Sequence, residues 1–182
     1  MQLDKVEKIL NKFAKYVVQQ SRTNLSRKKN NKSKNTSKRL YKSIDYRVNK
    51  YKDSIDLLFN MEEYGFFQDL GVSGKKKKYK TPYTYKTKMP PPKSLDKWIV
   101  RKKIAPRKNG KFTGRKIDKV GFAKSIQFLI ARSIFMNGIK PSFFFTKPFQ
   151  AAFKDIPKEL KEAFIFDIEQ DKMFFPENMN KN

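Results

Sequence analysis

Cysteine and histidine are both absent from this 182-residue chain, and tryptophan occurs only once. Without cysteine there are no disulfides and no thiolate nucleophiles, and without histidine there is neither a Cys/His zinc site nor histidine-based acid–base catalysis. Long apolar runs are missing too, since no segment approaches the roughly 18 residues of a membrane span. The N-terminus mixes charges into its apolar residues, unlike a signal peptide. We therefore expect a soluble protein made in a cytoplasm.

Acidic residues are scarce, with 17 Asp and Glu against 43 Lys and Arg, so the net charge is +26. The positive charge is confined to residues 1–154, because residues 155–182 contain more acidic than basic side chains. A chain this basic is expected to lie beside nucleic acid, an acidic protein or, least of all, an anionic membrane surface. Lysine outnumbers arginine 35 to 8. This ratio favours diffuse attraction over specific recognition, which relies on the bidentate arginine fork.

The most regular stretch runs from residue 37 to residue 74. Apolar residues alternate with polar ones from Ile44 to Val48, and again from Ile55 to Met61 after a polar turn. Two such runs predict an antiparallel hairpin with one buried face. Tyr64, Phe67 and Leu70 are then spaced as on one side of a short helix, with Gly71 as its C-terminal stop.

Helical periodicity recurs in three longer segments, at residues 3–20, 119–136 and about 148–166. A shorter helix is predicted after Ser94, with Leu95, Trp98 and Ile99 on its buried side. The fold class that follows is α+β, with a small antiparallel sheet packed against a long N-terminal helix and C-terminal helices. We expect one domain over residues 1–166, followed by an acidic, flexible tail over residues 167–182.

Three long basic loops are expected, at residues 21–39, 75–93 and 101–118. The first has the composition of a solvated loop or of an arm laid on a polyanion. In the second, tyrosines interleave with lysines as on a surface that binds single strands, although the tyrosines would equally well pack on the protein body. The candidate residues facing DNA or an acidic partner are Arg27, Lys28, Lys29, Lys32, Lys34, Lys75, Lys76, Lys77, Lys78, Lys80, Arg107, Lys108, Lys111, Arg115 and Lys116.

Aromatic residues are expected to form a second kind of surface. Three consecutive phenylalanines at 143–145 are too many for one small core, so some of these rings should meet another molecule. The candidate assembly interface comprises Tyr64, Phe66, Phe67, Tyr79, Tyr83, Tyr85, Phe143, Phe144, Phe145 and Phe149.

Three motifs occur in a recognisable order. Leu40-Tyr41-Lys42-Ser43-Ile44 precedes the hairpin, and Tyr64-Gly65-Phe66-Phe67-Gln68-Asp69-Leu70-Gly71 follows it. The third is Gly138-Ile139-Lys140-Pro141, which leads through the phenylalanine triplet to Pro148-Phe149. Over residues 5–165 this order resembles the phage head–tail joining and tail-completion proteins, a family of small neck and tail components. The long basic loops and the acidic tail depart from that pattern.

The resemblance implies a structural virion protein of the neck, assembled in the cytoplasm of the host bacterium. It implies a homo-oligomeric ring with portal or adaptor proteins and tail proteins as partners, and no catalytic activity, cofactor or metal. Packaged DNA would pass through such a ring, and lysine loops would neutralise it without reading sequence. No membrane partner is expected.

Two other functions compete with this interpretation. One is a stand-alone, sequence-independent nucleic-acid-binding protein, which the charge and the tyrosines favour equally. The other is a metal-dependent nuclease, for which Glu62, Glu63 and Asp69 or the 169–172 segment would supply carboxylates. The nuclease is disfavoured because Glu62 and Glu63 would point about 100° apart on a helix.

Overall fold

The computed structural model describes residues 3–27, 37–51, 54–102, 104, 107–108, 111–112 and 121–174. The chain divides into two compact units: unit 1 is Met1–Glu62 with Phe144–Asn182, and unit 2 is Glu63–Phe143. The sequence predicts one domain over residues 1–166, whereas the structure shows that the chain leaves the first unit after the hairpin and returns to it at Phe144.

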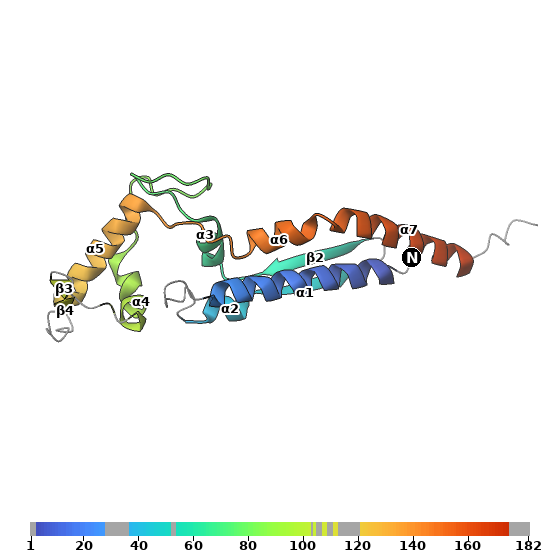
Figure 1. Ribbon diagram of the computed structural model, residues 1–182, viewed down its shortest axis with the longest axis horizontal. Coiled ribbons are helices and arrows are strands. Elements are labelled where there is room, and N and C mark those ends of the chain that lie inside the picture. Colours follow the sequence, from blue (N-terminus) through green and yellow to red (C-terminus); the bar gives the residue numbers. More distant parts are fainter. Residues whose placement is uncertain are drawn as a thin grey trace, which may run out of the picture. The chain divides into compact units, whose positions relative to one another are not determined.

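Unit 1 has the α+β architecture that the sequence predicts. A long N-terminal helix runs beside a two-stranded hairpin, and two C-terminal helices follow the same helix in the opposite direction (Figure 1). The strands pair from Asp45 opposite Asn60 to Lys50 opposite Ile55. In chain order, the elements are α1 (Asp4–Ser26), α2 (Arg39–Ser43), β1 (Asp45–Lys50), β2 (Ile55–Asn60), α6 (Thr146–Phe153) and α7 (Ile156–Phe174).

The first helix is longer than its sequence indicates. Its apolar stripe is clear as far as Val18, and the residues after it are mostly polar, which predicts a loop from residue 21. Helix α1 nevertheless continues to Ser26, because Leu25 is buried against Leu40 and Phe144. The amide of Asn24 also donates a hydrogen bond to the carbonyl of Phe144, at 3.2 Å. The first basic loop therefore begins after α1, and residues 28–36 of it lie outside the described part of the chain.

Phe144, Phe145 and Phe149, expected at an assembly surface, pack within unit 1. Phe144 is 2% exposed, and Phe145 and Phe149 pack their rings on Phe59, with centroids 5.3 and 5.9 Å apart. Phe13 on α1 meets the same group, with its centroid 5.5 Å from that of Phe149. These rings do not compete for one small core because α1 is long enough to carry three separate clusters along its length.

The C-terminal region is also helical where a flexible tail is expected. The single helix predicted over 148–166 is two helices separated at Lys154 and Asp155, and α7 then continues to Phe174. Asp167, the first residue of the expected tail, is buried. Residues 175–182 of that tail lie outside the described residues.

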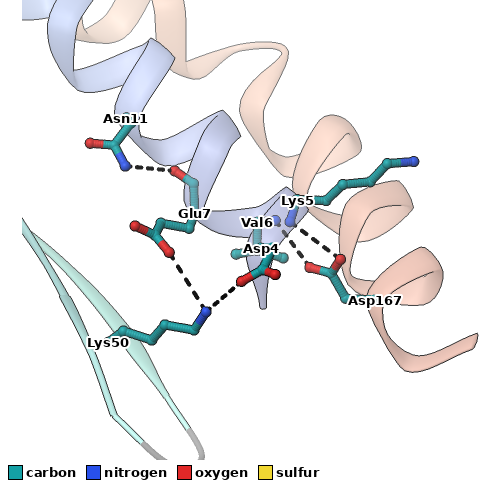
Figure 2. A network of polar contacts seen from close by, with 7 residues as sticks. All are labelled: Asp4, Lys5, Val6, Glu7, Asn11, Lys50 and Asp167. Atoms are coloured by element: carbon teal, nitrogen blue, oxygen red, sulfur yellow. Dashed lines mark hydrogen bonds and ion pairs between the residues drawn. The ribbon is translucent and has the colours of Figure 1, made fainter. Parts of the chain in front are cut away.

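Asp167 explains why this region is helical and packed, because its carboxylate accepts hydrogen bonds from the first turn of α1. The donors are the backbone N–H groups of Lys5, at 3.2 Å, and Val6, at 3.1 Å (Figure 2). The first N–H groups of a helix have no intrahelical acceptor, and the residue before α1 is Leu3, whose side chain cannot supply one. A carboxylate at this position also interacts favourably with the helix dipole.

A second ionic contact near the same helix end involves the hairpin. Lys50 donates a hydrogen bond to Asp4 at 2.6 Å, and its ammonium lies 3.6 Å from Glu7 (Figure 2). This hydrogen bond lowers the pKa of Asp4 and raises the pKa of Lys50. All three side chains are well exposed, so the contact contributes little to the stability of the fold.

Unit 2 is built around α5, and its other elements are short. The 3₁₀ segment η1 and α4 pack on α5, and Ile99 of α4 is buried there. Trp98, expected in the core, is 41% exposed. The third basic loop contains a small hairpin despite its proline and glycines. The elements are α3 (Tyr64–Leu70), η1 (Pro92–Leu95), α4 (Asp96–Arg101), β3 (Arg107–Lys108), β4 (Lys111–Phe112) and α5 (Gly121–Asn137). Among all the helices described, none is long and apolar enough to cross a membrane.

Replacing Asp167 with alanine is expected to lower the free energy of unfolding by about 1–3 kcal/mol, because two N–H donors at a buried helix end lose their acceptor. Denaturant unfolding followed by circular dichroism measures this change. Glu169→Ala, an exposed carboxylate on the same helix, is the matched control and should stay within about 0.5 kcal/mol of the native value. Equal effects of the two variants would contradict the capping role.

Candidate polyanion-binding and assembly surfaces

The lysine run of residues 75–78 lies on a backbone that the end of α5 holds in place. The backbone N–H of Lys75 donates to the carbonyl of Phe135 at 3.0 Å, and that of Lys76 donates to the carbonyl of Met136 at 2.8 Å. Carbonyls in the last turn of a helix lack intrahelical donors. The lysine run therefore caps α5, and its backbone is ordered.

The side chains of this run remain free to meet a partner. Lys75, Lys76, Lys77 and Lys78 are all exposed, and Lys80 is exposed just beyond them. Positive charge near the C-terminal end of a helix is favourable because the helix dipole is negative there. The ammonium of Lys75 also lies 5.5 Å from the centroid of the Phe135 ring, within range of a cation–π contact. We call residues 75–80 the lysine loop.

The lysine loop is connected to a close backbone crossing. Val72 and Ile139 exchange two backbone hydrogen bonds, of 2.9 and 2.8 Å, so that residues 67 positions apart form one antiparallel bridge. Gly71 and Gly138 flank the bridge with φ of +76° and +71°, a conformation that other residues rarely adopt. A Cβ on Gly138 would collide with the carbonyl oxygen of Val72.

The same crossing joins α3 to the segment after α5. The hydroxyl of Ser142 donates to the carbonyl of Gln68 at 2.6 Å, and the N–H of Phe143 donates to the carbonyl of Asp69 at 3.0 Å. Two of the three sequence motifs, the Tyr64–Gly71 element and the Gly138–Pro141 segment, therefore form one hydrogen-bonded structure. Their glycines are needed for the backbone geometry of unit 2.

The tyrosines after the lysine loop pack on the body of unit 2. The ring of Tyr83 lies 4.6 Å from that of Phe67, nearly perpendicular to it, and Tyr85 lies 6.3 Å from Phe135. Burial raises the pKa of the Tyr85 phenol. Tyr79 is half-buried as well. Of the two roles considered for these residues, the structure shows packing on the protein body.

Helix α3 keeps its aromatic side chains at the surface. Tyr64, Phe66 and Phe67 are each about two-fifths to one-half exposed, while Gly65 and Asp69 on the same helix are buried. These three are the expected interface residues that the structure leaves most accessible.

The sequence missed a further group of exposed apolar residues in unit 2, because helical periodicity predicts a buried side without indicating how much of it finds a partner. That group comprises Trp98, Val100, Phe128 and Leu129.

The remaining basic candidates are only partly described. Arg27 is exposed at the end of α1, and Arg107, Lys108 and Lys111 are described by their backbone in the β3–β4 hairpin. Lys28, Lys29, Lys32, Lys34, Arg115 and Lys116 lie outside the described residues.

An open groove of about 720 Å³ lies in unit 1, along the last turns of α1. Arg22 is held there by a 2.8 Å hydrogen bond from its guanidinium to the carbonyl of Ile44, and by the ring of Tyr41, 5.7 Å away. Sequence reasoning missed this groove because it placed residue 22 in a loop, where no geometry can be predicted. The lining residues are Gln19, Gln20, Arg22, Thr23, Ser26, Arg27 and Tyr41.

The carboxylates considered for a nuclease have other contacts. Glu62 forms a 2.8 Å ion pair with Arg39 in unit 1, whereas Glu63 and Asp69 belong to unit 2. Asp69 is buried in α3. Within the described residues, no cluster of three or more carboxylates that could hold a metal ion is found.

Comparison of the chain with protein-family models, with curated proteins and with solved structures gave no match.

Gly138→Ala is expected to destabilise unit 2 by about 1–2 kcal/mol from the left-handed backbone alone, and by more because of the collision with Val72. Hydrogen exchange measures the effect at the amides of Val72, Lys75 and Lys76, which should exchange faster. Lys140→Ala, at a nearby exposed position, should leave these amides unchanged. Unchanged exchange in the Gly138 variant would show that the crossing does not hold the lysine loop.

Proposed function

We propose that this protein is a structural, non-enzymatic component of the phage neck, of the head–tail joining or tail-completion type. It would assemble into a ring that joins portal to tail around the DNA passage, with portal or adaptor and tail proteins as its neighbours in the virion. The observation that carries the proposal is the crossing in unit 2. Two motifs that resemble this family are separated by most of unit 2 in sequence, yet they are hydrogen-bonded to each other.

The exposed aromatic residues of α3 support an assembly role. Tyr64, Phe66 and Phe67 lie on the helix that the crossing anchors, so they are presented from an ordered backbone. Aromatic side chains contribute most at interface centres, where they lose contact with water. A ring requires a surface of this kind to meet a different surface on the next subunit.

The lysine loop supports a contact with DNA phosphates that does not depend on the base sequence. Its ammonium groups are compact point charges that neutralise phosphates without forming the bidentate contacts that read bases. Its backbone is already ordered by α5, so little conformational entropy is lost when a polyanion binds. These properties suit a surface along which DNA moves.

A stand-alone, sequence-independent nucleic-acid-binding protein is the second candidate, and the lysine loop favours it equally. The exposed aromatic residues of α3 serve a different purpose in each function, since they would bury against another subunit in a ring and would stack on bases in a stand-alone protein. The oligomeric state of the protein therefore decides between them.

Light scattering on the purified protein at low and high salt, with and without a short DNA duplex, is expected to show one discrete oligomer whose mass is independent of DNA. Phe66→Ser should shift the mass toward the monomer, because it removes an exposed ring from the proposed contact. Tyr51→Ser, an exposed aromatic residue in unit 1, is the control and should keep the oligomer. A monomer that coats DNA without forming a particle of defined mass would contradict the neck assignment and favour the second candidate.

Replacing Lys76, Lys77 and Lys78 together with glutamine is expected to weaken binding to a random duplex and to reduce its salt dependence. If each lysine neutralises one phosphate, the slope of log K against log salt falls by about 0.9 per lysine. Fluorescence anisotropy over a salt series measures both quantities. Lys8, Lys12 and Lys15, exposed on α1, changed together to glutamine form a control with the same loss of charge. An equal loss in both variants would show that net charge alone attracts DNA.

A further inference from the structure

The groove along the end of α1 differs from the lysine loop in the chemistry of its charges. Its two cations are Arg22 and Arg27, although arginine supplies only 8 of the 43 basic residues. Its other lining residues are neutral, and among the described residues that line it none is acidic. Arginine presents five N–H donors in a planar fork that matches phosphate and carboxylate oxygens.

Arg22 is pre-organised for binding an anion. One Nη atom donates to the carbonyl of Ile44 at 2.8 Å, and the guanidinium lies near the ring of Tyr41. The Nε atom of the same side chain is buried and has no hydrogen-bond partner in the described part of the chain. Because the Nε atom is buried, an anion in the groove would meet the guanidinium through its Nη atoms and its positive charge. A fixed guanidinium also loses little rotamer freedom on binding.

The neutral groups of the groove define how such an anion would be held. The hydroxyl of Thr23 already donates to the carbonyl of Gln19 at 2.9 Å, so its hydrogen is not available to a ligand. The side-chain amides of Gln19 and Gln20 and the hydroxyl of Ser26 remain as neutral donors beside the two guanidiniums. The open shape admits an extended chain and not only a single small ion.

The helix dipole opposes an anion here, since the groove lies at the C-terminal end of α1. That end is equivalent to about half a negative charge. Two guanidiniums outweigh it, and the N–H of Arg27 already satisfies the carbonyl of Thr23 at 3.0 Å. The sequence between Arg27 and Arg39 adds five lysines and no acidic residue, which raises the positive potential of the region whatever its conformation.

We propose that this groove is a phosphate-binding site for the backbone of a nucleic acid strand, with Arg22 as its fixed guanidinium and Arg27 as its second cation. The site goes beyond the proposed function, because it holds whether or not the protein assembles into a ring. A phosphodiester is favoured over a protein carboxylate because successive phosphates of one strand can meet the two guanidiniums and the neutral donors that line the open groove.

Arg22→Lys and Arg27→Lys in the full chain test the proposal without changing its net charge. Each is expected to weaken binding of a labelled oligonucleotide about tenfold near physiological salt, because lysine replaces planar, paired donors with a point charge. Arg132→Lys, at an exposed position on α5, is the control and should bind like the native protein. Native-like binding by the two groove variants would overturn the proposal and leave only diffuse attraction.

A direct measurement comes from the Nε–H signal of Arg22 in a nitrogen-15 NMR spectrum, assigned as the signal that Arg22→Lys removes. A short oligonucleotide is expected to shift this signal, and Arg27→Lys is expected to reduce the shift at equal concentration. Two results would overturn the assignment to nucleic acid: a shift with inorganic phosphate but not with the oligonucleotide, or a tighter response to polyglutamate, which would identify an acidic protein as the partner.

Discussion

A single buried carboxylate closes unit 1, because Asp167 near the end of the chain holds the first turn of α1 near its beginning. A 23-residue helix exposes N–H groups at one end and carbonyls at the other, and both ends need partners. The chain provides Asp167 at the first end, and Leu25 and Asn24 packed on Phe144 at the second. Residues at both ends of the chain are therefore required to complete one core, although unit 2 lies between them in sequence.

The corresponding constraint in unit 2 is the backbone crossing at Gly71 and Gly138. It brings the end of α3 against the end of α5, and the chain that leaves it supplies the N–H groups that cap α5. The capping groups belong to the backbone of Lys75 and Lys76, so the hydrogen bonds do not depend on the side chains. One segment thus completes a helix and carries a row of positive charges into solvent.

The sequence predicts elements whose signal is local and misses those that depend on distant contacts. The hairpin and α3 were predicted because alternation, helical spacing and Gly71 lie within a few residues of one another. The last turns of α1 were missed because Leu25 becomes a core residue only through contacts outside its own helix, with Leu40 and with Phe144, 119 residues away. For Trp98 the local signal is misleading. Its apolar character predicts burial, but α4 buries Ile99 and leaves Trp98 exposed. The packing of Phe144 and Phe145 within unit 1 was missed because one core was assumed where α1 carries three clusters.

The same distinction applies to the candidate surfaces. Composition predicts where lysine is dense, but it indicates neither that the lysine loop has an ordered backbone nor that Arg22 lies in a groove. In the lysine loop the hydrogen bonds that cap α5 use only backbone groups, and of the four exposed side chains only Lys75 has a described contact, with the ring of Phe135. Four adjacent positive charges repel one another. Neutral polar side chains would be solvated at these positions without this repulsion. Four adjacent exposed lysines are therefore the feature of unit 2 on which the proposal of a polyanionic partner rests.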